Sequence, residues 1–310
     1  MQDFATRIRE ELEDGPGLRS LTTDRRVVWL AIWLFFIANW VGQDYFSPQG
    51  LNLLLMLTVI AVLLTWFRAE PTTHSTLARW IGKVPGLRSR PMVVDPRAST
   101  DGGPEPHMTN RQQMGLVAII ALLFGMSVAS HQLTPFAMIG GLLLLVMAGR
   151  LRPWGIPVLM IVLVSTWLVF MATTFLDGRI AALLSEFGRP DQFAESNVAG
   201  RLRGSAGHVL VVQARLGFTL GIWVLALVGG LRRLRAGRFD LTLALLAMAP
   251  FGLVLVQGYG GEMILRVFLF GIPFMAFFAA AALTPTPNPA SWRLSVAIVV
   301  LSVVMAGGQL

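Results

Sequence analysis

Glu262 and Arg266 are two charged residues at the start of a stretch that is otherwise apolar through Leu283. They lie four positions apart, so on a helix they would share one face about a turn from each other. An ionisable group at membrane depth costs roughly 2.5–3.5 kcal/mol, and it normally faces protein or water rather than lipid. A carboxylate can act as a general base, and an arginine can grip a phosphate through paired donors. The two residues are therefore candidates for a functional site, and Arg266 together with Arg215 could hold a polyprenyl-phosphate head group.

Three further polar motifs interrupt the apolar segments: GQDYFSPQG at 42–50, SHQLTP at 130–135, and the loop 177–207 with the entry to the next span, including His208, Gln213 and Arg215. Both tyrosines of the chain lie in the polar motifs, at positions where they would stack on a sugar ring or anchor the membrane interface. The candidate catalytic residues, as general bases toward a sugar hydroxyl, are Asp44 and Glu262. The candidate substrate-binding residues are Tyr45, His131, Gln132, Arg215, Tyr259 and Arg266.

These residues also have structural interpretations, which the sequence leaves open. Ser47 and Thr134 each precede a proline, the pattern of a hydroxyl N-cap followed by proline at the first helical position. His131 would interact favourably with the C-terminus of the preceding helix. Glu262 is favoured at a helix start, where a nearby arginine would neutralise it in a structural ion pair. Arg215 lies about 9 Å below Val209 at helical rise, from where its side chain would have to snorkel outward if it faced lipid.

The composition is that of a membrane protein. Of the 310 residues, 55% are hydrophobic and only 14% are charged, whereas soluble domains carry about a quarter charged residues. The net charge of +8 is dispersed between hydrophobic segments, while a nucleic-acid-binding protein concentrates such charge on a soluble face. The absence of cysteine excludes a thiol nucleophile, a disulfide and a cysteine-rich metal site. No cofactor is indicated by the sequence, in which Walker, Rossmann, HExxH and GxSxG motifs are all missing, and a divalent metal stays an open alternative.

The hydrophobic pattern predicts an all-α, polytopic transmembrane helix bundle with eight or nine spans. Most segments have the ~17–25 residues that cross the hydrocarbon core, although the fourth is short. They divide the chain into a polar tail at 1–23, a first helical hairpin at 24–67, a flexible loop at 68–112 and a main bundle at 113–310. Within the main bundle, the loop 177–207 carries helical spacing that predicts a short interfacial helix. The predicted segments are Val27–Tyr45, Pro48–Phe67, Gln113–Ser130, Thr134–Gly149, Pro153–Leu176, His208–Leu231, Phe239–Gln257, Gly261–Leu283 and Arg293–Gly307.

The distribution of arginine and lysine predicts a cytosolic N-terminus. With alternating crossings, 19 of the 25 basic residues fall in inside segments. Only four (Arg179, Arg189, Arg201 and Arg203) fall outside, and two (Arg215 and Arg266) lie within spans. The polar motifs then all lie at the outer face of the cytoplasmic membrane, where a lipid-linked substrate is accessible.

Three stretches carry a family resemblance: TDRRVVWLAIWLFFIANWVGQDYFSPQGL, SHQLTPF and YGGEMILRVFLFGIPFMAFFAA. They resemble large actinobacterial membrane proteins that are similar to GT-C-type glycosyltransferases, over most of residues 23–285. Enzymes of that type move sugars from polyprenyl-phosphate donors on the extracytoplasmic side, so the resemblance implies a membrane lipid and a polyprenyl-phosphate-linked sugar as partners. The residues that match the family motifs are Asp44, Tyr45, Ser47, Pro48, Gln49, His131, Gln132, Thr134, Pro135, Gly260, Gly261, Glu262 and Arg266.

The first outer loop departs from the family pattern. GT-C enzymes carry a catalytic acidic residue in that loop, after their first transmembrane helix, and here the loop is only GQDYFSPQG. The chain therefore resembles an N-terminally shortened member, for which we expect little sugar transfer without a partner membrane polypeptide that supplies the missing helices. Other functions stay open: a lipid-linked sugar transporter or flippase, a non-catalytic membrane subunit, and an O-antigen polymerase or ligase.

Overall fold

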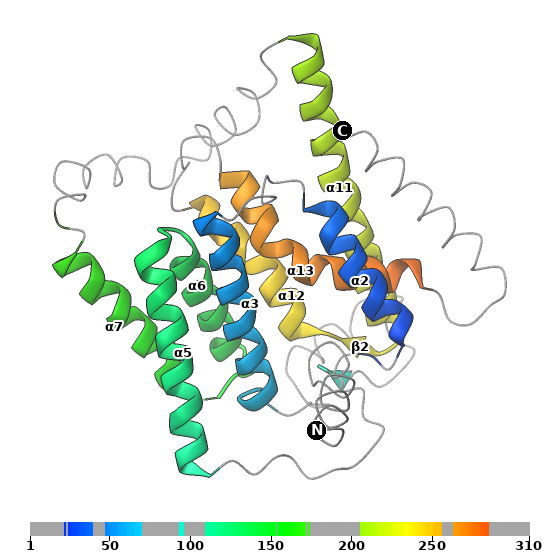
Figure 1. The fold of residues 1–310 in the computed structure, drawn as a ribbon. Helices are drawn as coiled ribbons and strands as arrows, with labels where there is room; N and C mark the ends of the chain where they lie inside the picture. Colours follow the sequence, from blue (N-terminus) through cyan, green and yellow to red (C-terminus); the bar gives the residue numbers. More distant parts are fainter. Residues whose placement is uncertain are drawn as a thin grey trace, which may run out of the picture.

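The computed structural model describes residues 22, 24–39, 47–69, 93–95, 109–152, 154–171, 173, 205–255 and 263–284. These residues are almost entirely helical, in agreement with the predicted all-α class. The elements, labelled as in Figure 1, are α2 (Arg25–Ala38), α3 (Pro48–Trp66), β1 (Val93–Val94), α5 (Asn110–Ser130), α6 (Thr134–Met147), α7 (Gly155–Phe170), α11 (Ala206–Arg235), β2 (Arg238–Phe239), α12 (Leu241–Met248), η4 (Ala249–Leu255) and α13 (Met263–Leu283).

Helix α13 is the centre of the bundle. Most of its residues are buried, and it packs against α2, α11, α12 and η4. A second group of helices, α3, α5, α6 and α7, packs together beside it, and α6 joins the two groups through contacts with α12 and η4. The long apolar run after Arg266 is therefore buried by neighbouring helices, which is one of the two environments, protein core or lipid, that a helix hydrophobic all round can occupy.

Helices α11 and α13 approach each other closely at Gly229. A Cβ atom added at Gly229 would lie 1.8 Å from the carbonyl oxygen of Phe278 and 3.0 Å from the amide nitrogen of Ala282. Small residues let helix backbones meet this closely inside membranes, where packing rather than the hydrophobic effect drives helix association. Gly229 and the alanine-rich end of α13 are therefore what bring these two helices together.

Several helix starts follow from local sequence. Asp24 accepts a hydrogen bond from the Arg26 amide (2.9 Å) at the start of α2, and Thr109 forms a capping box with Gln112 at the start of α5. The predicted cap Ser47 is confirmed, because its hydroxyl accepts from the Gly50 amide (3.0 Å) with Pro48 at the first helical position. The prediction for Thr134 is wrong: Thr134 is the first residue of α6 and its hydroxyl contacts a histidine instead.

Four of the described helices, α3, α5, α11 and α13, are long and apolar enough to cross a membrane. Eight of the nine predicted hydrophobic segments contain a described helix. The ninth lies outside the described residues, as does the predicted loop 177–207 except for its last three residues, which form the N-cap and start of α11. One predicted continuous helix is broken. The segment that begins at Leu241 changes from α12 to the 3-10 helix η4 next to Pro250, because proline lacks an N–H and its ring clashes with the carbonyl four residues earlier.

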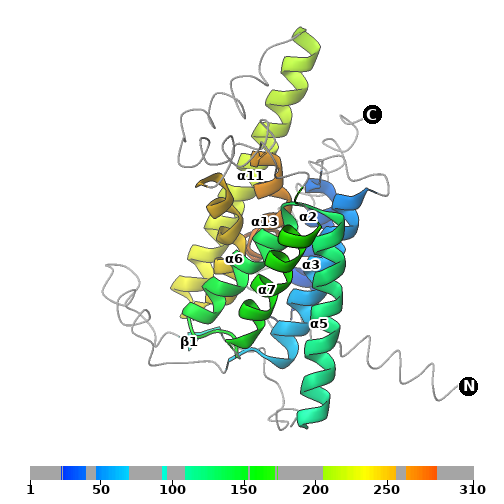
Figure 2. The same cartoon turned by 90° about the vertical axis from the view of Figure 1, so that its left-hand side faces the viewer.

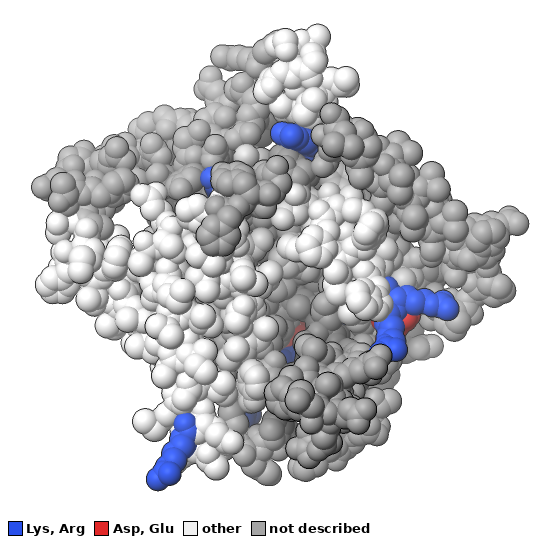
Figure 3. Space-filling view, viewed as in Figure 1, with Lys and Arg blue, Asp and Glu red and all other residues white. Residues whose placement is uncertain are grey.

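Most of the described helices run between two opposite ends of the bundle (Figures 1 and 2). The turn between α5 and α6, with His131, lies at one of them together with the starts of α3 and α11; we call this the His131 end. The strand pair β1–β2 lies at the other, together with the last turns of α3 and α11; we call this the Asp95 end. The described surface between the two ends is largely uncharged on the face drawn in Figure 3, as expected for helices that face lipid.

Residues 93–95 are a structured part of the loop 68–112, for which the sequence predicts a flexible connector. β1 pairs in parallel with β2, with Val93 opposite Arg238 and Val94 opposite Phe239. Val94 and Asp95 are buried. The prediction therefore misses this docked segment, because two residues of strand are too few to give a periodic pattern.

Candidate functional site

The predicted site residues divide into two groups. His131, Gln132, Arg215 and Arg266 belong to the described part of the chain. The other four candidates, Asp44, Tyr45, Tyr259 and Glu262, lie outside it, so their predicted convergence stays a prediction.

His131 connects α5 to α6 and uses its ring to hold the start of α6. Its backbone amide donates to the Ser127 carbonyl at the end of α5, and its Nδ1 accepts a hydrogen bond from the Thr134 amide (3.2 Å). The Thr134 hydroxyl lies 2.9 Å from the same nitrogen. A nitrogen that accepts from an amide N–H carries no proton, so in the neutral ring the proton is on Nε2. The structural interpretation of His131 thus needs correcting: the side chain caps the helix that follows rather than stabilising the one that precedes.

Arg266 acts electrostatically on His131. Burial lowers the pKa of His131 to about 4, and the positive charge of Arg266 lowers it in the same direction. Arg266 comes from α13 and is half-buried, whereas His131 comes from the α5–α6 turn. The structure therefore brings two sequence-predicted site residues near each other from separate helices and keeps His131 neutral at pH 7.

Gln132 and Arg215 are exposed. Arg215 lies in the first third of α11, where its backbone carbonyl accepts from the Thr219 hydroxyl (2.9 Å). No contact between Arg215 and the His131–Arg266 pair is seen among the described contacts, so its membership in one cavity with them stays a prediction.

A buried polar cluster near His131 was not predicted as a site. Asn52 of α3 is 0% exposed, and its amide nitrogen donates to the Pro48 carbonyl (2.7 Å) and to the Ser130 hydroxyl (2.9 Å). The Ser127 hydroxyl donates to the Asn52 side-chain oxygen (2.5 Å). The lone asparagine in an apolar helix was the available signal, because a polar side chain at that depth needs a partner from another helix.

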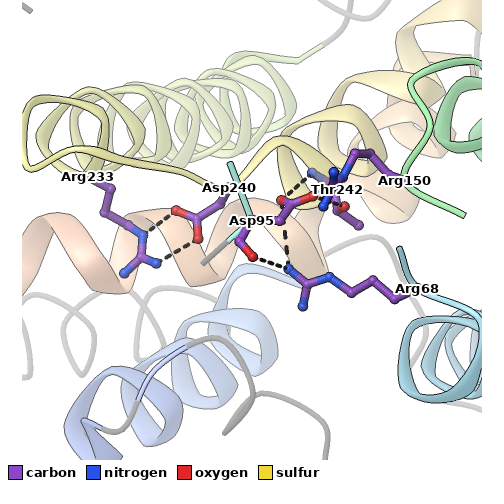
Figure 4. Close-up of polar contacts among 6 residues, drawn as sticks. All are labelled: Arg68, Asp95, Arg150, Arg233, Asp240 and Thr242. Atoms are coloured by element: carbon purple, nitrogen blue, oxygen red, sulfur yellow. Dashed lines mark hydrogen bonds and ion pairs between the residues drawn. The ribbon is translucent and has the colours of Figure 1, made fainter. Parts of the chain in front are cut away.

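The Asp95 end contains a second buried polar cluster (Figure 4). Asp95 is 1% exposed, and its carboxylate accepts from the Arg150 Nε (2.6 Å), the Thr242 amide (2.9 Å) and the Thr242 hydroxyl (2.5 Å). Arg68 lies 3.9 Å from the same carboxylate and donates to the Asp95 carbonyl (3.2 Å). Asp95 has a positive φ of 50°, a conformation that aspartate adopts more readily than most residues. These contacts join the end of α3, the turn after α6 and the start of α12.

Arg233 forms the neighbouring ion pair in the same view. Its Nε and Nη2 atoms donate to the two carboxylate oxygens of Asp240 at 2.5 and 2.7 Å, and its guanidinium lies 5.0 Å from the centre of the Phe277 ring. Burial lowers the pKa of Arg238, with a further contribution from Arg233. The adjacent Arg232 donates to the Ala282 carbonyl at the end of α13. Asp95 and Asp240 each pair with an arginine. These ion pairs hold the helix ends together at the Asp95 end.

The described residues contain no group of three histidine, aspartate or glutamate side chains that would hold a metal ion. The family-model, curated-protein and solved-structure comparisons give no match to the chain.

Proposed function

We propose that this chain is a multi-pass protein of the cytoplasmic membrane that binds a polyprenyl-phosphate-linked sugar at its outer face and resembles a glycosyltransferase. In this proposal it has eight or nine spans and a cytosolic N-terminus. The observation that carries the proposal is that Arg266 of α13 and His131 of the α5–α6 turn, two of the predicted site residues, lie near enough for the charge of Arg266 to lower the pKa of His131. Arginine and a neutral imidazole can both donate hydrogen bonds to a phosphate.

The orientation rests on the charges at the two ends. The Asp95 end carries Arg68, Arg150, Arg233 and Arg238, together with further arginines of the basic run 232–238. By the positive-inside rule such an end faces the cytosol. The His131 end would then face outward, where the phosphate of a lipid carrier lies at the membrane interface while its prenyl chain lies among the helices.

The proposed reaction is the transfer of a sugar from its carrier. An acceptor hydroxyl oxygen attacks the anomeric carbon, the bond from that carbon to the phosphate oxygen breaks, and polyprenyl phosphate leaves with the bonding electrons. The proton of the hydroxyl passes to a carboxylate, for which Asp44 and Glu262 are the candidates. Arg266 would stabilise the negative charge that develops on the departing phosphate.

Binding of polyprenyl monophosphate to the purified protein in lipid nanodiscs tests this proposal. Arg266→Lys keeps the charge but loses the planar fork of paired donors. We expect it to weaken binding by about tenfold, the loss of roughly one charge-assisted hydrogen bond, with a smaller effect on thermal stability. Arg111→Lys is the matched control, since that exposed arginine lies at the other end of α5.

The outcomes separate the candidate functions. No binding by the unmodified protein, or equal binding by Arg266→Lys, contradicts the phosphate site. Binding without sugar transfer favours a transporter, a flippase or a non-catalytic subunit. Transfer that occurs only after co-expression with a second membrane polypeptide supports the proposed partner, whereas full transfer by the purified chain refutes the need for one.

A further inference from the structure

A groove of about 600 Å³ lies between α5 and α7, two helices that pack side by side (Figures 1 and 2). Its volume is within the range of about 300–1,000 Å³ that small-molecule sites have. On the α7 side it is lined by Leu159, in the second turn of that helix. The described residues that line it on the α5 side are Asn110, Gln113, Met114, Val117, Ala118 and Ala121.

The lining residues of α5 form one continuous face of that helix. They recur at i, i+3, i+4, i+7, i+8 and i+11, the spacing of residues that lie above one another on a helix. Ala118 and Ala121 carry only a methyl group, which leaves room beside Leu159. From Asn110 to Ala121 the face is about 16 Å long at 1.5 Å per residue. One leaflet of a bilayer is about 15 Å of hydrocarbon, half of the ~30 Å core. The groove therefore has the length of one acyl chain.

The surface around the groove is apolar and exposed. Met114 is 72% exposed, Leu122 65% and Val158 58%. Helix α5 is long and apolar enough to cross a membrane, and the described residues of 109–171 include no aspartate or glutamate. An extended apolar surface on such a helix marks a contact with lipid or with another apolar partner. Membrane acyl chains therefore have direct access to the groove.

The groove changes from polar to apolar along its length. Asn110 and Gln113 line it in the first turn of α5, at the Asp95 end, and the residues that follow are apolar. Side-chain amides donate hydrogen bonds, and the positive pole of a helix lies at its N-terminus, where phosphate groups are favoured. An anionic phosphodiester suits this mouth, and a hydrocarbon chain suits the rest. That order of groups is the order in a phospholipid.

We propose that this groove binds a glycerophospholipid from the leaflet at the Asp95 end. Its phosphodiester lies at the side-chain amides of Asn110 and Gln113, and one acyl chain runs past Ala118 and Ala121 beside Leu159. The site is at the opposite end of α5 from His131, and it does not depend on the binding of a sugar carrier. Because α7 packs chiefly against α5 and α6, the bound chain adds a contact that holds α7 to the bundle.

The test of the chain position titrates delipidated protein in detergent with phosphatidylglycerol and follows the first bound lipid by native mass spectrometry. Ala118→Phe places a ring in the groove, and we expect it to weaken lipid binding by about tenfold. Ala129→Phe is the matched control, since it adds the same ring at an exposed alanine of α5 beyond the groove. It should bind the lipid as the unmodified protein does.

The test of the headgroup position uses two neighbouring glutamines. Gln113→Glu places a negative charge at the mouth beside the phosphodiester, and we expect about tenfold weaker binding. Gln112→Glu adds the same charge on the side of α5 that faces away from the groove, where glutamate preserves the capping box with Thr109. This control should change the affinity much less.

A phosphatidylglycerol with a diazirine in its acyl chain locates the lipid in nanodiscs. We expect cross-links to concentrate on residues 114–121 and on Leu159. Cross-links spread evenly around α5, or equal affinities of Ala118→Phe and Ala129→Phe, would overturn the groove assignment. Equal affinities of Gln113→Glu and Gln112→Glu would overturn the placement of the phosphodiester.

Competition with polyprenyl monophosphate separates the two lipid classes. Displacement of phosphatidylglycerol by an equimolar amount would show that the groove takes the prenyl chain of the carrier, which overturns the phospholipid assignment. Retention of phosphatidylglycerol supports the assignment. No binding of phosphatidylglycerol to the unmodified protein refutes this inference and leaves the proposed phosphate site at the His131 end unaffected.

Discussion

The contact between α11 and α13 gives the sharpest test of the fold, through the substitution Gly229→Ala. The new Cβ would lie 1.8 Å from the Phe278 carbonyl oxygen and 2.8 Å from its carbon, whereas ordinary contact begins near 3.4 Å. The obstacle is helix backbone, which cannot rotate away as a side chain can. The two helices would have to separate by more than an ångström at this point.

The expected cost follows from two opposing effects. Overpacking of a well-packed interior costs about 1–3 kcal/mol and occasionally more. Alanine is the better helix former by about 1 kcal/mol, which offsets part of that cost. Because the clash is with backbone, we expect the overpacking cost to lie at the upper end and Gly229→Ala to destabilise the protein by about 2 kcal/mol.

The neighbouring substitution Gly230→Ala is the matched control. Its Cβ would have only the Phe278 ring carbon Cδ1 nearby, at 3.8 Å, which is an ordinary contact. This variant should be as stable as the unmodified protein or slightly more stable. Thermal unfolding in detergent, followed by tryptophan fluorescence, compares the two variants directly. Equal unfolding temperatures for Gly229→Ala and Gly230→Ala would refute the close helix contact.

Two further predictions concern the charged and titratable groups. Asp95→Asn should destabilise the protein by about 3–5 kcal/mol, because it removes the carboxylate that pairs with buried Arg150. The control Asp24→Asn, at an exposed helix cap, should cost about 1 kcal/mol or less. Urea or thermal unfolding measures both variants, and a similar small loss of stability in both would contradict the structural role of Asp95. The pKa of His131 is about 4 in the folded protein, against an ordinary value of 6.5. As the pH falls, His131 therefore takes up a proton in the unfolded chain at a higher pH than in the folded protein. The free energy of unfolding should then decrease as the pH drops from about 6.5 to 4. The variant His131→Asn keeps an acceptor for the Thr134 amide and does not titrate. The difference in unfolding temperature between this variant and the unmodified protein should shrink toward pH 4. A constant difference from pH 7 to pH 4 would show that His131 does not titrate in this way.

The sequence determines the helical segments because helix formation in a membrane depends on local properties. Each apolar run of sufficient length must satisfy its backbone hydrogen bonds internally, which only a helix does within a single segment. The cap at Ser47 is also local, since the hydroxyl and the amide it binds are three residues apart. The same reasoning identified Arg266 and His131 as unusual, because charged and polar groups stand out in apolar surroundings.

The tertiary structure decided what those groups contact. The partners of Asp95 lie 27, 55 and 147 positions away in the sequence, so no spacing rule connects them. The sequence of the segment 93–95 also does not distinguish it from an ordinary loop. The structural role of His131 likewise depended on which helix its ring faces, which the sequence of either helix leaves open. The partner of the Asn52 oxygen, Ser127, likewise lies 75 positions away in the sequence. Burial and partner choice are properties of the packed bundle, which local sequence patterns leave open.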